Sequence, residues 1–220
     1  MKKFLLFLGA PGSGKGTQAQ KLQNKYGICQ ISTGDLLREV IARKTDLGKK
    51  VANYVHNGEL VPDEVIVEIV KDKLAQDKDI KENGFILDGF PRTVRQADLL
   101  RKVLQDNNMQ LEAVVFFEID LETIVKRILG RLTCAKCGKI YNSYNNLPAQ
   151  EGQCDVCGGK VARRVDDTEE KIRKRFSIYK EQTEPLLGYY EDSLIKIAGD
   201  KDLNAIFEDL EEIVSAKINA

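Results

Sequence analysis

Short apolar runs alternate with longer stretches of helical periodicity along most of the chain. Runs of strand length occupy residues 3–8, 27–31, 85–87, 113–119 and 194–197. The stretches between them have the spacing of helices, and the first helix is expected over residues 14–25. Because strands that alternate with helices build βαβ units, the pattern predicts an α/β fold with a five-stranded parallel sheet and helices on both faces. Ligands of such folds bind beyond the carboxyl ends of the strands.

Two segments interrupt this alternation. Residues 32–61 are helical and contain no strand pattern, whereas residues 130–167 are rich in Gly, Asn, Gln and Cys. The second segment has too little apolar periodicity to bury a core without help. We therefore expect a core domain of residues 1–31, 62–129 and 168–220 that carries two insertions, each able to move independently.

Composition places the chain among ordinary globular proteins. It has 220 residues, of which 42% are hydrophobic and 31% charged, enough for one α/β core and an appendage. Its 34 basic and 34 acidic residues cancel. A zero net charge argues against a broad nucleic-acid or membrane footprint, so any basic site must be confined to a small area.

The first residues resemble the beginning of a secretory signal, because Lys2 and Lys3 precede the apolar run 4–8. The run is short for a signal core, and cleavage after Ala10 would cut a glycine-rich loop. No other stretch approaches the roughly 18 apolar residues that a membrane span needs. We expect a cytoplasmic protein, in which thiols stay reduced.

Four of the five cysteines have the spacing of a metal site. Two C-x2-C pairs are separated by sixteen residues, within the range typical of a four-thiolate zinc centre. A glycine follows each pair, and Gly138 and Gly158 permit the left-handed turn behind it. Four protein ligands leave no open position for water, so the zinc is expected to be structural and to replace the missing apolar core. The predicted ligands are Cys134, Cys137, Cys154 and Cys157.

Other interpretations of these residues stay open at this point. The pairs can be redox thiols, or the insertion can be a zinc ribbon that binds nucleic acid, although its segment 131–164 carries only four more basic than acidic residues. Cys29 is expected to be a small buried residue. The one histidine, His56, is expected at the surface, and a single His makes His-based metal clusters impossible and a Ser-His-Asp hydrolase hard to assemble.

The sequence GAPGSGKGT at residues 9–17 lies between the first strand and the first helix. Glycines let backbone N–H groups converge on phosphate oxygens at the positive end of a helix, and Lys15 places an ammonium against the terminal phosphates. The usual pattern has Ser or Thr directly after the Lys. Here Gly16 follows, and the hydroxyl comes one residue later, at Thr17.

A carboxylate and a set of arginines accompany this loop. In GFILDGFPRT a buried strand delivers Asp88 to the edge of the sheet where the glycine loop begins. Asp88 either holds Mg²⁺, which bridges phosphate oxygens, or caps the following loop. Guanidinium groups pair with phosphates through two parallel hydrogen bonds. Six arginines flank the carboxylate and the insertions: Arg38, Arg92, Arg127, Arg131, Arg164 and Arg175.

Together, GAPGSGKGT, STGDLLR from Ser32, GFILDGFPRT and the arginine-flanked insertion resemble the adenylate kinases over essentially the whole chain. The loop of that family also reads Gly-Lys-Gly-Thr. The four-cysteine insertion is similar to the long, zinc-containing lid of some bacterial members, some of which have Asp at the position of Cys157. The resemblance implies reversible transfer of the terminal phosphoryl group of Mg-ATP to AMP, giving two ADP. We expect a monomer, because the mobile segments need free space, and no nucleic-acid or membrane partner.

The resemblance also implies site residues. For ATP they are Gly12, Ser13, Gly14, Lys15, Gly16, Thr17, Arg131, Ile140, Tyr141 and Lys201, the last matched only by a short G-x-K. For AMP they are Thr33, Arg38, Glu59, Leu60, Val61, Gly89, Phe90, Pro91, Arg92, Gln96, Arg164 and Arg175. The implied catalytic groups are Lys15, Asp88, Arg92, Arg127, Arg131, Arg164 and Arg175.

The resemblance leaves rival functions. A kinase for UMP, CMP or GMP shares the loop, although Thr33 and Gln96 resemble the adenine-side pair and a long lid is less expected in the pyrimidine enzymes. A guanine-nucleotide switch would carry Asn-Lys-x-Asp, which the sequence lacks. A zinc-ribbon nucleic-acid binder would show steep salt dependence and no phosphoryl transfer. In a phosphotransferase the site must close, because water would otherwise compete with the acceptor.

Overall fold

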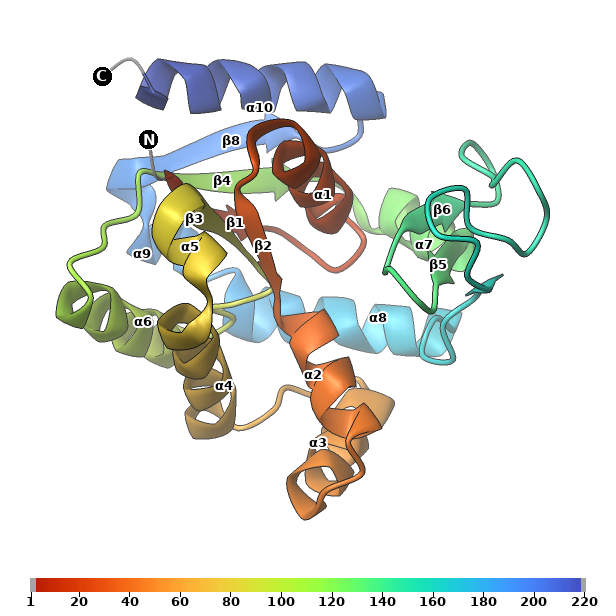
Figure 1. The fold of residues 1–220 in the computed structure, drawn as a ribbon, viewed down its shortest axis with the longest axis horizontal. Coiled ribbons are helices and arrows are strands. Elements are labelled where there is room, and N and C mark those ends of the chain that lie inside the picture. The colour runs from red at the N-terminus through yellow and green to blue at the C-terminus, as the bar shows by residue number, and fades with distance from the viewer. Residues whose placement is uncertain (1–2, 219–220) are drawn as a thin grey trace.

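The computed structural model describes residues 3–218 and contains a five-stranded parallel sheet (Figure 1). Strand β1 (Lys3–Leu8) lies at the centre, between β3 (Gly84–Asp88) and β4 (Ala113–Glu118). The edge strands are β2 (Cys29–Ser32), beside β3, and β8 (Leu194–Ala198), beside β4. The predicted fold class and the number of strands in the parallel sheet are confirmed.

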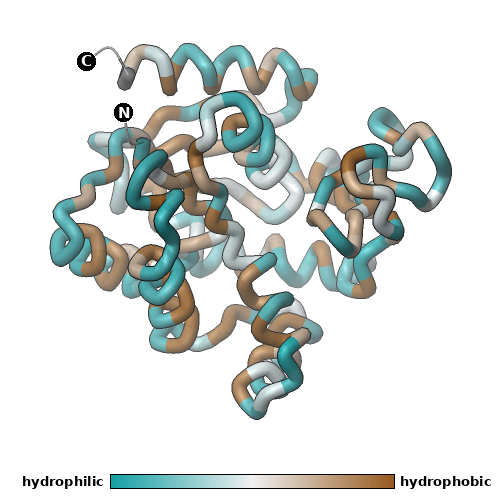
Figure 2. The backbone as a smooth tube through the Cα atoms, viewed as in Figure 1, coloured by the Kyte–Doolittle hydropathy of each residue, from teal (hydrophilic) through white to brown (hydrophobic). Residues whose placement is uncertain are grey.

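Alternate residues of the strands enter two separate hydrophobic clusters. In β1, Leu6 and Leu8 belong to one cluster, whereas Leu5 and Phe7 belong to the other. Because both faces of a parallel sheet are covered, its strands are apolar at every position rather than at every second one. Figure 2 shows the hydrophobic residues gathered on the inner strands and the hydrophilic ones on the outer turns of the helices.

Helices on the two faces supply the remaining core residues. The cluster around Leu6 is covered by α4 (Asp63–Gln76), α6 (Val94–Asp106), α7 (Leu121–Leu129) and α8 (Glu169–Ile178). The cluster around Leu5 is covered by α1 (Lys15–Tyr26) and α10 (Leu203–Ile218). Shorter elements complete this part: α5 (Lys78–Asn83), a π-helical turn at Tyr179–Thr183, α9 (Leu186–Tyr189) and a 3₁₀ turn at Glu191–Ser193.

Glycines explain two of the differences from the predicted boundaries. Gly14, expected as the first helical residue, has φ of 100° and precedes α1 as its N-cap. Gly27, expected to begin the second strand, has φ of 71° and ends α1 by donating its N–H to Gln23 O. Left-handed backbone at these positions is cheap only for glycine, so the helix begins and ends there and the strand begins at Cys29. Cys29 is half-buried rather than buried as expected, whereas His56 is exposed as expected.

The two interruptions in the strand pattern form separate structures. Residues 32–61 contain α2 (Thr33–Ala42) and α3 (Asp46–Asn57), which pack on each other below the sheet in Figure 1. Residues 130–167 contain an antiparallel sheet of β5 (Arg131–Cys134), β6 (Ile140–Asn142) and β7 (Val161–Ala162). These three strands were not predicted, because runs of two to four residues show no periodicity. Within the described residues, no helix is long and apolar enough to cross a membrane.

Candidate active site

A cavity of about 420 Å³ lies where β1 and β3 end, and residues of both inserted segments line it. It brings together residues from separate parts of the chain: the glycine loop, the end of β3, α2, α7, the inserted sheet, α8 and the segment after β8. The predicted site residues that line it are Gly12, Gly14, Lys15, Gly16, Thr17, Arg38, Leu60, Asp88, Gly89, Pro91, Arg92, Arg127, Arg131, Ile140, Tyr141, Arg164, Arg175 and Lys201.

A smaller cavity of about 70 Å³ shares several of these residues. Four predicted residues line it without reaching the larger one: Thr33, Glu59, Val61 and Gln96. Two further predicted residues line neither cavity. Ser13 is fully buried behind the loop, where its hydroxyl oxygen accepts from Lys15, and Phe90 packs in the core cluster that contains Leu6.

The glycine loop is shaped by close packing as well as by backbone conformation. Gly12 has φ of 84°, and a Cβ there would lie 2.6 Å from a side-chain carbon of Ile128. Lys15 folds back into the loop, where Nζ donates to Gly9 O and Ala10 O, each at 2.8 Å. Burial lowers the pKa of Lys15 to about 8, against the opposing charge of Asp88. The ammonium is therefore held inside the loop and is easier to deprotonate than a surface lysine.

Asp88 lies next to the residue that follows Lys15. A Cβ on Gly16 would lie 3.1 Å from Asp88 Oδ2, so the loop has glycine at the position where other phosphate loops have Ser or Thr. The carboxylate accepts from Gln30 Nε2 at 3.2 Å and, among the described residues, from no backbone N–H of the following loop. The alternative that Asp88 caps that loop is therefore not supported. Gln30 was not foreseen, because nothing in the sequence places β2 beside β3.

Two adjacent carboxylates, Asp166 and Asp167, hold two of the arginines. Arg131 donates from Nε and Nη2 to the two oxygens of Asp167, at 2.8 and 2.5 Å, and the Asp167 side chain is 2% exposed. Arg175 pairs with Asp166 at 3.3 Å. Neither carboxylate was foreseen, although an acidic pair two residues after Arg164 is a charge pattern that could have indicated it. Both fix guanidinium groups that line the cavity.

Arg38 pairs with a carboxylate of its own helix, Asp35, at 2.5 Å, and the other three arginines bond to backbone or hydroxyl oxygens. Arg92 Nε donates to Gly89 O at 2.7 Å, Arg127 Nη1 to Gly199 O at 2.6 Å and Arg164 Nε to Thr133 Oγ1 at 3.1 Å. Burial lowers the pKa of Arg92 and of Arg164 to about 10, and neighbouring arginines add to the effect. Cations crowded into a partly dry cavity repel one another, so the site favours a polyanion.

Three predicted nucleotide-binding residues have additional contacts. Lys201 lines the larger cavity but pairs with Asp209 of α10 at 2.7 Å. Ile140 lies close to the glycine loop, since a Cβ on Gly16 would be 3.6 Å from its Cδ1. The Tyr141 hydroxyl, by contrast, donates to Cys154 Sγ at 3.4 Å and lowers the pKa of that thiol to about 6.

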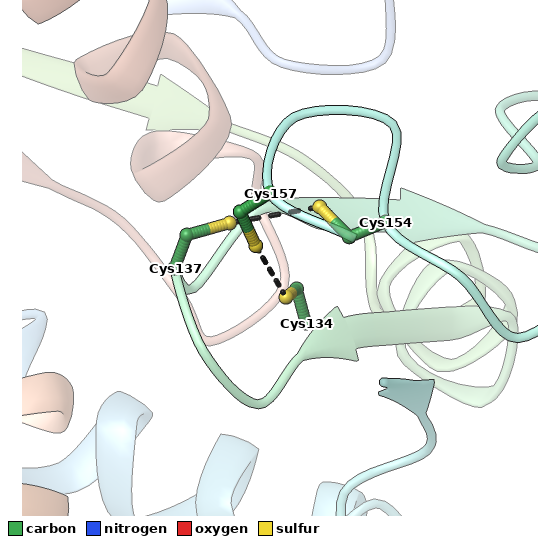
Figure 3. Close-up of side chains that lie close together, drawn as sticks. All are labelled: Cys134, Cys137, Cys154 and Cys157. Atoms are coloured by element: carbon green, nitrogen blue, oxygen red, sulfur yellow. Dashed lines mark hydrogen bonds between the residues drawn. The ribbon is translucent and has the colours of Figure 1, made fainter. Parts of the chain in front are cut away.

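The four predicted cysteines form a cluster at the side of the cavity. Figure 3 shows their sulfur atoms turned toward one another. The Sγ atoms of Cys134 and Cys157 are 3.5 Å apart, those of Cys137 and Cys154 3.6 Å, and all four lie within 4.8 Å of one another. Tetrahedral zinc with bonds of about 2.3 Å puts thiolate sulfurs about 3.8 Å apart. Gly138 and Gly158, with φ of 72° and 67°, form the expected left-handed turns. The cluster fits a tetrahedral metal ion.

A glycine loop that leads from a strand into a helix, a carboxylate on the neighbouring strand and a cavity lined with arginines define a phosphate-loop nucleotide-binding protein. The adenylate kinase family model matches residues 7–195. An adenylate kinase of Archaeoglobus fulgidus is 48% identical over 96% of this chain and 97% of its own length. One of Thermodesulfovibrio yellowstonii is 49% identical over 97% and 99%. The chain belongs to the adenylate kinase family.

Proposed function

We infer that the protein transfers the terminal phosphoryl group of Mg-ATP to AMP and forms two ADP, reversibly. One observation carries the proposal. A glycine loop with its buried ammonium and six arginines from separate segments all line one cavity, and a smaller cavity with an uncharged amide adjoins it. A switch that binds one nucleoside triphosphate does not need a second recess beside the phosphate site, whereas two nucleotides placed with their phosphates together need one recess for each base and cations between them.

Catalysis rests on alignment and charge. The transition state of phosphoryl transfer is loose, with charge spread over the transferred oxygens, so no general base is required. We assign the phosphates of ATP to residues 12–17 and the neutralising charges to Lys15 and the arginines. Arg131 and Arg175 are oriented in advance by Asp167 and Asp166, which reduces the cost of ordering them around the phosphates.

Asp88 is the residue proposed to hold Mg²⁺. Its carboxylate lines the cavity beside Gly16, and carboxylate oxygen is the donor that this ion prefers. When bound with ATP, the ion neutralises phosphate charge. Gln30 occupies one oxygen of Asp88 and fixes the direction in which the other points.

Zinc is the metal proposed for the cysteine cluster. Four thiolates fill the tetrahedral coordination of the ion, so its role is to order the inserted sheet rather than to activate water. We propose that residues 130–167 and 32–61 close over the nucleotides as two bodies, so that the acceptor and not water receives the phosphoryl group. We also propose that the protein acts as a monomer, because both segments need free space.

The proposal is tested by incubating the protein with Mg-ATP and, in turn, AMP, GMP, CMP and UMP, and by following the nucleoside diphosphates formed. We expect ADP from AMP and turnover at least about tenfold slower with the other acceptors, the scale of losing a specific hydrogen bond to a base. Faster turnover with UMP, CMP or GMP would assign the chain to that acceptor instead. No diphosphate from any acceptor would overturn the proposal.

A further inference from the structure

The smaller cavity is lined by a side-chain amide whose orientation can select a base. Apolar side chains of Leu37, Val61 and Ile66 line it together with three arginines. Among the described residues that line it, Gln96 is the one with a side-chain carboxamide. An amide offers a donor and an acceptor side by side, as the edges of nucleobases do, so its orientation decides which edge it matches.

The orientation of Gln96 is fixed from both sides. Its Oε1 accepts the backbone N–H of Arg92 at 2.7 Å, and its Nε2 donates to Asp63 Oδ1 at 2.7 Å. An ionised carboxylate only accepts and a backbone N–H only donates. If the amide were flipped, its NH₂ group would face the backbone N–H of Arg92, which is also a donor. Its oxygen would then face the carboxylate of Asp63, which is also an acceptor. Gln96 is 2% exposed, so water cannot readily repair the mismatch.

Asp63 is itself held in place. It lies in the first turn of α4, and its second oxygen, Oδ2, accepts from the hydroxyl of Thr93 at 3.2 Å. Thr93 is the N-cap of α6, the helix that carries Gln96. The carboxylate therefore joins the beginnings of α4 and α6 and leaves Gln96 one free N–H and one free lone pair.

These two remaining positions match adenine and mismatch guanine. Adenine has an amino donor beside the N1 acceptor, whereas guanine has an oxygen acceptor beside the N1 donor. When the arginines bind the phosphate of the acceptor nucleotide, the base can approach the amide in one orientation. We propose that Asp63 is a positioning residue that holds the Gln96 amide in the orientation selecting adenine over guanine. This inference rests on the proposed function, because it concerns the acceptor of that reaction.

The experiment compares Asp63→Ala with a matched control, Glu64→Ala. Glu64 is the next residue in the same turn, has the same charge and pairs with Arg95 of α6, but does not contact Gln96. The readout is the ratio of kcat/KM for AMP to kcat/KM for GMP within each variant. A ratio within one preparation is independent of the fraction of folded protein, so general destabilisation does not move it.

We expect Asp63→Ala to lower this ratio about tenfold or more, the size expected when a buried amide loses its partner, with KM for ATP unchanged. The ratio of Glu64→Ala should equal that of the unmodified chain. Asp63→Asn retains an oxygen that can accept from Gln96 Nε2 and should recover most of the ratio. Equal losses for AMP and GMP, the same loss in Glu64→Ala, or no recovery in Asp63→Asn would each overturn the inference.

Binding measurements distinguish failure of the inference on Asp63 from failure of the proposed function. AMP and GMP affinities are measured by calorimetry without ATP, so they report base selection in the absence of turnover. An unmodified chain that does not transfer phosphate refutes the function. The role of Asp63 alone is refuted if the unmodified chain transfers phosphate and the Asp63→Ala variant keeps its preference for AMP in both assays.

Discussion

The parallel sheet and the inserted cysteine sheet are held together by different interactions. The parallel sheet lies between two clusters of buried aliphatic and aromatic side chains, to which most helices contribute. The buried cluster of the inserted sheet consists of Cys134, Tyr141, Cys154 and Val161, so half of it is cysteine. The first region can be stable through burial alone. We expect the second to need a metal ion, because four residues bury too little apolar surface.

Both regions nevertheless supply walls of one cavity. The region with the large core carries the glycine loop and Asp88, whose positions relative to each other are fixed by the register of β1 and β3. The inserted sheet carries Arg131 and Ile140, which are only as well placed as that sheet is ordered. One site is therefore shared by a region with a large apolar core and a region whose order we expect to depend on a metal ion.

Metal removal should have the largest effect. Structural zinc sites contribute on the order of 10 kcal/mol to small modules, so we expect chelation to release residues 130–167 while the parallel sheet stays folded. Amide hydrogen exchange would show fast exchange confined to that segment, and phosphoryl transfer would fall sharply. Cys154→Ser should have the same effect, whereas Cys29→Ser should not. Unchanged exchange in a preparation shown to be metal-free would contradict the role of the metal.

Lys15→Met should strongly slow phosphoryl transfer without unfolding either region. Loss of one positioned charge lowers kcat by more than about 100-fold. The control is Lys25→Met in the same helix, where an exposed lysine pairs with Glu211. Both variants should retain zinc and the melting temperature of the parent within a few degrees. Near-normal turnover of Lys15→Met would show that the ammonium does not act on the phosphates.

Tyr141→Phe should weaken metal retention without removing a ligand. The hydroxyl donates to Cys154 Sγ and accepts from Asp155 N at 2.9 Å, and loss of such outer contacts typically costs about 10- to 100-fold in metal affinity. Competition with a chromophoric chelator measures the change. Tyr144→Phe, whose side chain lies on the same insertion and is 60% exposed, is the control. Equal metal affinity in the two variants would show that the hydrogen bond from Tyr141 to Cys154 does not contribute to metal retention.

The smallest effect is expected from a change of pH, and it concerns Lys15, which lies in the region of the parallel sheet. Burial lowers the pKa of Lys15 to about 8 from an ordinary 10.5. Below pH 8 the lysine is charged in both the folded and the unfolded chain, and the burial penalty on stability is fully present. As the pH rises from 8 toward 10.5, only the folded chain loses the proton, and the penalty is relieved.

The same titration should appear in the kinetics. We expect kcat/KM for ATP to fall above about pH 8, because the free protein then loses its ammonium. Bound phosphates favour the charged form, so kcat should fall at higher pH than kcat/KM. The residual activity of Lys15→Met should lack this step. An identical alkaline step in that variant would assign it to another group.

Local patterns allowed most of the fold to be predicted. The five strands, the glycine loop and the cysteine tetrad were found because each is set by residues close in sequence: apolar runs, a turn between strand and helix, and paired thiols. The three short strands of the insertion were missed, because their pairing depends on the cluster they surround. The division into a core and two moving insertions, and the roles of single site residues, stay predictions.

The partners of the functional side chains were not predictable in the same way. The hydrogen-bonded partners are far apart in the sequence: Gln30 and Asp88 by 58 positions, Arg131 and Asp167 by 36, and Gln96 and Asp63 by 33. Each pair joins different elements, so it exists only after the strand order and the packing of α4 on α6 are set.

By itself, the sequence determined the candidate residues for the chemistry, since residue type and short spacing are local properties. Only the tertiary structure decided how those groups are oriented, because a guanidinium or an amide takes its direction from a neighbour that packing, and not chain distance, brings within reach.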